Sequence, residues 1–230
     1  MRWGDPRDWD YGDRVRARLA RARRALDLGT GDGEIFASFA PFAGVAVATE
    51  TWPANVPIAG RRLHGVGAHL IHCTPAPDNV AVVPARALPS LPFRDAAFDL
   101  VIDRHESFVA TEVARVLGGG GWFVTQQVGG RNLLELNDAL GAPLPYFGWH
   151  LVSCCRQLED AGLRVLDRRE SFTDVQFDSI DQVMEYLDAV PWQAPGVARP
   201  RSARALERLS RRLPLRARAH RFYVEATKRT

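Results

Sequence analysis

The chain has 230 residues, of which 46% are hydrophobic and 25% charged, a composition that excludes a disordered chain and indicates a soluble globular protein. The formal net charge is +3 and Lys228 is the only lysine, so the basic residues give little indication of phosphate binding. The three cysteines lack the spacing of metal ligands, which predicts reduced thiols in a cytoplasmic protein and no metal site. No apolar run approaches the length of a membrane span, and segment 1–24 is too charged for a signal peptide.

Predicted strands and helices alternate in the first half of the chain. We expect strands over residues 25–28, 44–49, 79–83, 98–102 and 121–128. Helices are expected over residues 13–23, 33–42, 53–63 and 107–117. Such alternation indicates a parallel sheet with right-handed crossovers, which binds ligands at the carboxyl ends of its strands.

The second half departs from this alternation. Helices are expected over 150–161 and 180–189, and strands over 163–170 and 221–227. Basic residues are concentrated in segment 199–221, which could contact nucleic acid. Because arginines there fall at helical spacing opposite leucines, a solvated helix face is the favoured interpretation.

The first predicted strand carries an acid and ends in three alternate glycines. Gly29, Gly31 and Gly33 free the backbone to turn sharply and to lie against a ligand. Asp27 lies within a strand that should be buried, where a carboxylate needs a partner such as a ligand ammonium group. Glu50 follows the second strand, where a carboxylate can accept both hydroxyls of a ribose. Together these residues predict a site for a nucleotide-type cofactor.

A nicotinamide site shares much of this pattern, but its fingerprint requires a small residue where this chain has Glu34. A glycine turn in an unrelated α/β protein is a second alternative. Segment 27–33 instead resembles motif I of the class I S-adenosylmethionine (SAM) dependent methyltransferases, and segments 91–93, 98–101 and 112–117 extend this resemblance. The chain looks most like the type 11-like subgroup that methylates small molecules.

The resemblance implies a Rossmann-like α/β fold. Its sheet would have seven mostly parallel strands, the last antiparallel, with a helical cap. Residues 1–230 would form a single methyltransferase domain, with cap insertions near 129–161 and 171–215. SAM would be the cofactor. In this family an acid commonly holds the adenine, but segment 84–90 has none, so backbone near Ala85 to Leu88 would hold it instead. The implied cofactor-binding residues are Asp27, Gly29, Thr30, Gly31, Gly33, Glu50, Thr51, Ala85, Arg86 and Asp103.

Residues that could do chemistry follow the strand expected over 98–102. His105 is the candidate general base because histidine titrates near neutral pH, and Glu106 would orient it or bind a polar substrate group. In the alternative interpretation, Asp103 and Glu106 only cap the N-terminus of the next helix or place negative charge there, and His105 only lines the cofactor pocket.

Aromatic residues around one histidine suit the wall of a small-molecule pocket, which predicts substrate contacts by Tyr146, Trp149 and His150. Ordinary packing explains the same residues. The Asn/Asp-Pro-Pro-aromatic motif of enzymes that methylate the exocyclic amine of a base is missing after residue 102, so nucleic acid is the lesser substrate. The expected activity is methyl transfer to an oxygen, nitrogen or carbon atom. The alternatives are an RNA or protein methyltransferase and a SAM-fold binding protein without turnover.

Overall fold

The computed structural model describes every residue except 4–8, 75, 82, 85–86 and 196–202. The chain divides into two compact units. Unit 1 comprises Met1–Asp8, Val128–His150 and Glu170–Arg221, and unit 2 comprises Trp9–Gln127, Leu151–Arg169 and Phe222–Thr230. Each unit is described by itself.

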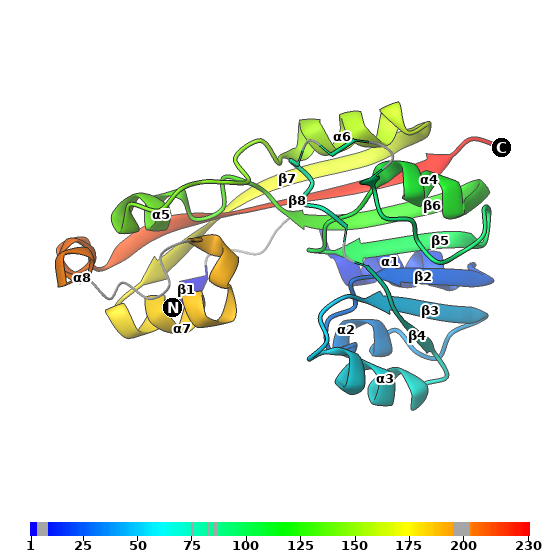
Figure 1. Cartoon of the computed structure of the whole chain (residues 1–230), viewed down its shortest axis with the longest axis horizontal. Coiled ribbons are helices and arrows are strands. Elements are labelled where there is room, and N and C mark those ends of the chain that lie inside the picture. The colour runs from blue at the N-terminus through cyan, green and yellow to red at the C-terminus, as the bar shows by residue number, and fades with distance from the viewer. Residues whose placement is uncertain (4–8, 75, 82, 85–86, 196–202) are drawn as a thin grey trace. The chain divides into compact units, whose positions relative to one another are not determined.

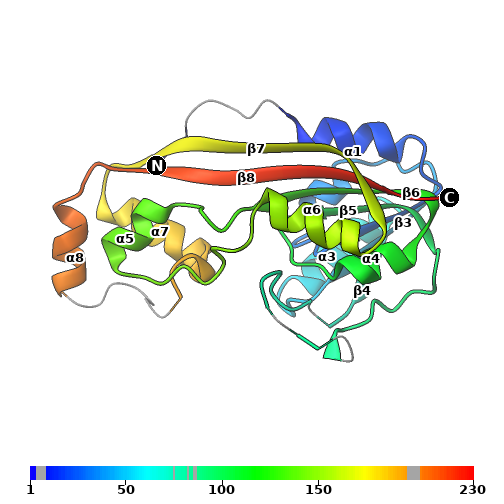
Figure 2. The same ribbon diagram turned by 90° about the horizontal axis from the view of Figure 1, so that it is seen from above.

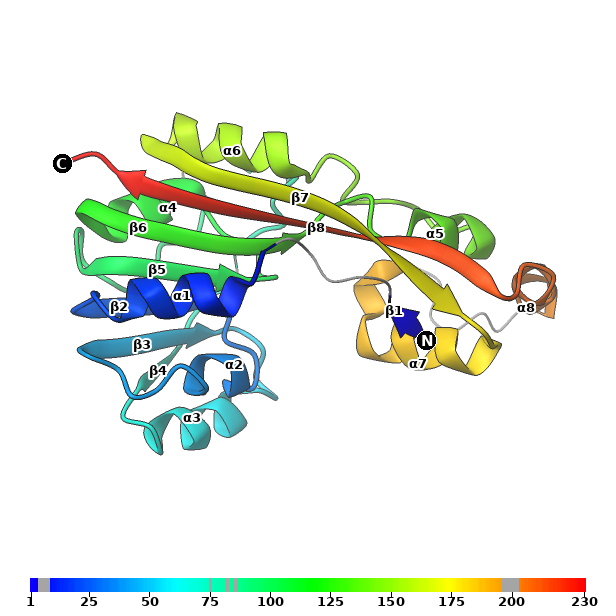
Figure 3. The same ribbon diagram turned by 180° about the vertical axis from the view of Figure 1, so that it is seen from behind.

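Seven strands form a sheet in the order β7-β8-β6-β5-β2-β3-β4 (Figure 1). Their bounds are β2 (Arg24–Leu28), β3 (Val45–Glu50), β4 (His69–His72), β5 (Phe98–Arg104), β6 (Leu117–Val128), β7 (Leu163–Phe177) and β8 (Leu215–Lys228). The pairs β2/β3, β2/β5, β3/β4 and β5/β6 are parallel, whereas β8 runs opposite to β6 (Figure 3). The predicted Rossmann-like sheet with an antiparallel last strand is therefore confirmed. An additional strand, β1 (Arg2–Trp3), pairs antiparallel with β7.

Helices cover both faces of the unit 2 sheet. Helix α1 (Tyr11–Leu19) lies on one face, and α4 (Ala110–Val116) and α6 (Leu151–Asp160) lie on the other (Figure 2). Two further helices, α2 (Glu34–Ala37) and α3 (Val56–His64), follow β2 and β3. The side chain of Asp10 begins α1 by accepting a hydrogen bond from Asp13 N at 2.9 Å. Buried residues such as Val15, Ala48 and Ile102 form the core between α1 and the sheet.

The side chain of Lys228 caps the C-terminal end of α4. Its Nζ donates to the carbonyl oxygens of Ala114 and Leu117, each at 2.7 Å. The last carbonyl groups of a helix have no partner within the helix, so this lysine satisfies groups that would otherwise need water.

The structure corrects the predicted third strand. Asn79 and Val80 lie in a turn, and the strand that pairs with β3 is β4 (His69–His72). The polar groups of Asn79 serve tertiary contacts instead: its side chain accepts from Phe108 N at 3.1 Å and its carbonyl from Gln157 at 2.9 Å. The helix expected over 33–42 is also shorter, because α2 ends before Pro41. Strands β7 and β8, with 15 and 14 residues, are longer than expected.

Unit 1 contains α5 (Leu134–Leu140), α7 (Ile180–Ala189), a short 3₁₀ helix η2 (Pro191–Gln193) and α8 (Ala203–Ser210). Of these, α7 and the helix in the basic segment 199–221 were expected. Leu136, Phe177 and Val183 belong to its own apolar core. Within the unit, His220 is fully buried, and its Nε2 lies 2.9 Å from Glu170 Oε1. Across the part of the chain that the structure describes, every helix is too short or too polar to serve as a membrane span.

Candidate functional site

The glycine loop after β2 adopts the backbone that its sequence predicts. Gly29, Gly31 and Gly33 have φ values of 61°, 64° and 79°, in the left-handed region that favours glycine. Thr49, at the neighbouring end of β3, supports the loop. Its hydroxyl accepts from Gly29 N at 3.3 Å, and its carbonyl accepts from Thr30 N at 2.9 Å. Sequence analysis missed Thr49, because its role depends on the parallel pairing of β2 with β3.

Glu106 packs directly on the first glycine of this loop. A Cβ atom on Gly29 would lie 2.3 Å from Glu106 Cγ and 2.6 Å from its Oε2. No side chain other than hydrogen fits such an approach, so Gly29 provides space as well as backbone freedom. The ends of β2 and β5 are thereby brought into contact.

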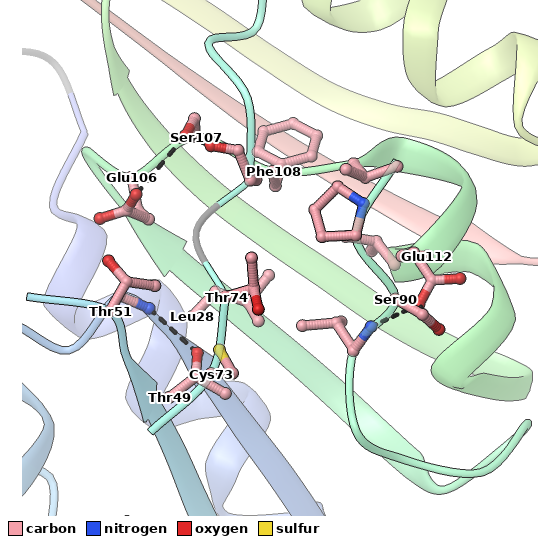
Figure 4. Close-up of a pocket in the computed structure, with 16 residues that line it drawn as sticks. Leu28, Thr49, Thr51, Cys73, Thr74, Ser90, Glu106, Ser107, Phe108 and Glu112 are labelled. Carbon is pink, nitrogen blue, oxygen red and sulfur yellow. Dashed lines mark hydrogen bonds between the residues drawn. The ribbon is translucent and has the colours of Figure 1, made fainter. Parts of the chain in front are cut away.

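A cavity that is open to solvent is lined by Gly29, and its empty space is about 460 Å³ when the adjoining solvent is included. Glu106, Ser107 and Phe108 face Thr51, Cys73 and Thr74 across it (Figure 4). Ser90 and Leu91 line the far side of this cavity. We call it the first cavity.

Glu112 fixes the far side of the first cavity. Its Oε2 accepts hydrogen bonds from Leu91 N at 2.7 Å and from the Ser90 hydroxyl at 3.0 Å. Arg115 bonds to Glu112 and to the carbonyl oxygen of Leu91, and its hydrogen bond is the main cause that lowers the pKa of Glu112. The Leu91 segment is therefore anchored by an ionised pair on α4.

A second cavity, of about 320 Å³ on the same measure, is also lined by Gly29. Asp27, Thr30, Tyr11 and Arg104 contribute its polar groups. The hydroxyl of Tyr11 is buried and has no hydrogen-bond partner among the described residues. A buried hydroxyl without a partner is costly, so a polar ligand would satisfy it. Tyr11 and Arg104 were not predicted, because neither belongs to the glycine motif.

Carboxylates gather at the ends of the strands beneath this loop. Burial, with a smaller contribution from the charge of Glu50, raises the pKa of Asp27 to about 7, against a hydrogen bond from Thr30 that lowers it. Burial is also the main cause that raises the pKa of Glu106, again with a contribution from Glu50. A cationic ligand would stabilise these ionised acids. These carboxylates therefore fit SAM, which carries a positive charge on both its ammonium and its sulfonium group.

Glu50 ends β3, where the ribose acid is expected, and is 3% exposed. The backbone N–H groups of Thr51 and Trp52 both donate to its Oε1 at 2.7 Å. These bonds hold the carboxylate in the turn that follows the strand.

The turn after β5 is clamped by three polar residues of β6. Thr125 and Gln127 both donate to Asp103 Oδ1, and Gln127 also donates to the Glu106 carbonyl at 3.0 Å. His105 has a positive φ of 69°, and Gln126 Nε2 lies 3.1 Å from its Nε2. A positive φ is strained for histidine, so the neighbouring hydrogen bonds are what hold this turn.

Of the predicted cofactor residues, Asp27, Gly29, Thr30 and Thr51 line the two cavities, whereas Gly31, Gly33 and Glu50 are not among the described lining residues. Asp103 is fully buried against β6 and is not among the described residues that line the two cavities. Ala85 and Arg86 lie outside the described residues. The predicted substrate residues Tyr146, Trp149 and His150 all belong to unit 1, where Gly130 N donates to the Trp149 carbonyl at 2.6 Å.

Comparisons with known proteins agree with this geometry. Residues 26–125 match the methyltransferase domain family. Curated proteins gave no match to the sequence.

Solved structures with the same fold include YcgJ from Bacillus subtilis, at 18% identity and a TM-score of 0.64, covering 96% of this chain and 98% of that one. The proposed methyltransferase BH2331 from Bacillus halodurans C-125 has 16% identity and a TM-score of 0.61, with 95% and 97% covered. A proposed sarcosine dimethylglycine methyltransferase from Galdieria sulphuraria has 13% identity and a TM-score of 0.56, with 94% and 82% covered. The resemblance drawn from the glycine motif is therefore confirmed: residues 26–125 match a methyltransferase domain, and the chain shares the fold of these solved structures.

Proposed function

We propose that this chain transfers a methyl group from SAM to an oxygen, nitrogen or carbon atom of a small organic molecule. The observation that carries the proposal is the pair of cavities that share Gly29, with Glu106 in the lining of the first and Asp27 in the lining of the second. An extended ligand with an adenosine end and a charged amino-acid end would occupy both cavities. When bound, SAM supplies an electrophilic methyl group, so the protein mainly binds, aligns and excludes water.

Each end of this ligand has a proposed set of partners. Asp27 binds the ammonium group in the second cavity, which the unpartnered hydroxyl of Tyr11 also lines. Glu50 accepts the ribose hydroxyls, and Thr51 lines the adenosine side. Gly29, Gly31 and Gly33 form the backbone wall between the two ends.

His105 and Glu106 form the proposed catalytic pair. Both follow β5 beside the glycine loop, and Glu106 lines the first cavity. A base is needed only when the methyl acceptor must lose a proton, and these are the groups that could take it.

A small-molecule acceptor is supported by the aromatic composition of segment 146–150 and by the name of the Galdieria sulphuraria protein, which refers to small amines. Tyr146, Trp149 and His150 are proposed to contact this acceptor, with residues 129–161 and 171–215 acting as cap insertions of one domain. A cytoplasmic location is part of the proposal, because Cys73, Cys154 and Cys155 are free thiols.

Calorimetry with SAM tests cofactor binding. We expect the wild type and Glu159→Gln, a matched change on the exposed face of α6, to bind SAM equally. Glu50→Gln removes the charge that would hold the ribose and should weaken SAM binding about 10-fold or more. Absence of SAM binding to the wild type would refute the cofactor assignment.

The substrate class is tested by incubating the protein with methyl-labelled SAM and, separately, a metabolite extract, RNA or cellular protein. Label in small molecules is the expected result. Label in RNA or in protein would establish the corresponding alternative. Binding of SAM without transfer to any of the three would identify a binding protein.

A further inference from the structure

The side-chain amide of Gln126 joins His105 to the indole of Trp9. Trp9 Nε1 lies 3.1 Å from Gln126 Oε1, and Gln126 Nε2 lies 3.1 Å from His105 Nε2. An indole N–H can only donate, so the atom of Gln126 that faces Trp9 must be the carbonyl oxygen. The amide nitrogen therefore faces the histidine, and the reverse orientation would place two donors against each other.

This orientation sets the proton position on His105. An amide nitrogen has no acceptor capacity, so His105 Nε2 must accept the hydrogen bond through its lone pair. In a neutral imidazole only one ring nitrogen carries a proton, and here that nitrogen is Nδ1. Protonating Nε2 would again bring two donors together 3.1 Å apart.

Two of the three side chains in this series of hydrogen bonds are buried. Trp9 and Gln126 are 6% and 1% exposed. Gln126 pairs with Arg104 across β5 and β6, and its carbonyl accepts from His105 N at 2.8 Å. Gln126 therefore presents a fixed amide to the ring of His105, which is itself exposed.

We propose that Trp9 and Gln126 lock His105 in the Nδ1–H tautomer, so that His105 serves as a hydrogen-bond donor and Glu106 is the group that accepts the substrate proton. The division of roles rests on the proposed methyl transfer, whereas the tautomer does not. Trp9 and Gln126 are positioning residues. In the proton step, the X–H bond of the acceptor breaks, its proton goes to a Glu106 carboxylate oxygen, and the electron pair stays on the atom that takes the methyl group.

Glu106 is suited to this role by its position and surroundings. It lines the first cavity and packs on Gly29, whereas its backbone carbonyl is fixed by Gln127. Burial raises the pKa of its carboxyl, which brings its basicity closer to that of an efficient proton acceptor.

Nitrogen NMR of the histidine rings tests the tautomer without any ligand. At about pH 8, where an ordinary imidazole is neutral, long-range ¹H–¹⁵N correlations distinguish a protonated from an unprotonated ring nitrogen. His105→Gln identifies the His105 signals by their loss. We expect the Nδ1–H pattern in the wild type, and a predominant Nε2–H pattern would overturn the proposal.

Gln126→Glu should invert this pattern. A carboxylate can accept both from Trp9 and from His105 Nε2–H, so the variant favours the Nε2–H tautomer. Gln157→Glu makes the same chemical change at an amide on α6 that bonds to Asn79, and it should leave the His105 signals unchanged. If Gln126→Glu fails to fold, Trp9→Phe provides a second test, because loss of the indole donor should produce a mixture of both tautomers. Unchanged His105 signals in the folded variant would contradict the proposal.

Activity measurements test the division of roles once a methyl acceptor has been found. An asparagine amide can mimic the Nδ1–H donor but cannot take a proton, so His105→Asn should keep at least about one tenth of kcat. Glu106→Gln should lose about 100-fold. The opposite ranking would overturn the roles, and SAM binding measured by calorimetry shows separately whether the proposed cofactor is at fault.

Discussion

Glu106 lies so close to Gly29 that the two residues join the ends of β2 and β5 through a contact that only a glycine permits. The same contact borders both cavities, because Gly29 lines each of them. Among the three glycines of the loop, the first is therefore the one whose substitution the structure constrains most tightly.

We expect Gly29→Ala and Gly31→Ala to differ sharply. Both glycines have positive φ, which costs an alanine about 1–2 kcal/mol. A Cβ on Gly29 would also collide with Glu106, whereas nothing lies within 4 Å of a Cβ on Gly31. Chemical denaturation should show the larger loss of stability for Gly29→Ala, and equal losses would contradict the contact.

The affinity for SAM should depend on pH through Asp27. Its pKa of about 7 in the free protein means that the carboxyl is largely neutral below that pH. Since the ammonium group of the ligand would bind the ionised form, wild-type affinity should rise about tenfold per pH unit up to about pH 7 and then level off. Calorimetry across this range checks the slope. Asp27→Asn should bind more weakly and lose the slope, and a slope retained in this variant would assign it to another group.

Asp27 should also affect the stability of the free protein. Its folded-state pKa lies above its usual value of 3.8, so between these values the folded state holds more protons than the unfolded state. The contribution of Asp27 to the free energy of unfolding is therefore greatest below about pH 4. It falls by roughly 4 kcal/mol in total as the pH rises to about 7. Asp27→Asn removes this loss and should be the more stable protein above pH 7, as thermal unfolding would show.

His220 should have the opposite pH dependence. Burial lowers its pKa from the usual value of 6.5, although Glu170 partly opposes the shift. Below about pH 6.5 the unfolded state then binds more protons than the folded state. The contribution of His220 to the free energy of unfolding is therefore greatest above about pH 6.5 and falls as the pH drops through that value. The difference in stability between the wild type and His220→Gln should shrink on acidification. A constant difference from pH 8 to about pH 5 would exclude this contribution.

Glu112→Gln should loosen the wall of the first cavity. The carboxylate accepts from Leu91 N and pairs with Arg115, so its loss should cost about 1–3 kcal/mol of stability at neutral pH. Arg115 lowers the pKa of Glu112 below its usual value of 4.5. The wild type should therefore exceed Glu112→Gln in stability by the full amount above pH 4.5, and this difference should disappear as the pH falls below that value. Glu159→Gln is the matched control and should leave the stability unchanged.

The features that could be predicted from the sequence are those in which one short segment contains all the necessary information. The glycine loop and its acids belong to a single strand-turn-helix-strand unit, and α7 (Ile180–Ala189) begins after Ser179, whose side chain accepts from Gln182 N at 3.3 Å. Their positions matched the predictions.

Features that depend on distant partners could not be predicted. The hydrogen bond between Trp9 and Gln126 joins residues 117 apart in the sequence. The segment expected as a strand over 79–83 has a suitable apolar pattern, but Asn79 and Val80 lie in a turn, where Asn79 bonds to Phe108 and to Gln157 of α6. Tyr11 was missed for the same reason, because only folding brings α1 to the cavity beside Asp27.

The position of Lys228 has a practical consequence for chemical modification. This residue is the only lysine of the chain, and its amine already donates to two carbonyl groups at the end of α4. The amine of Lys228 is therefore the one lysine side chain with which acylating reagents can react. That reaction would remove the positive charge and the hydrogen-bond donors that cap the C-terminal end of α4.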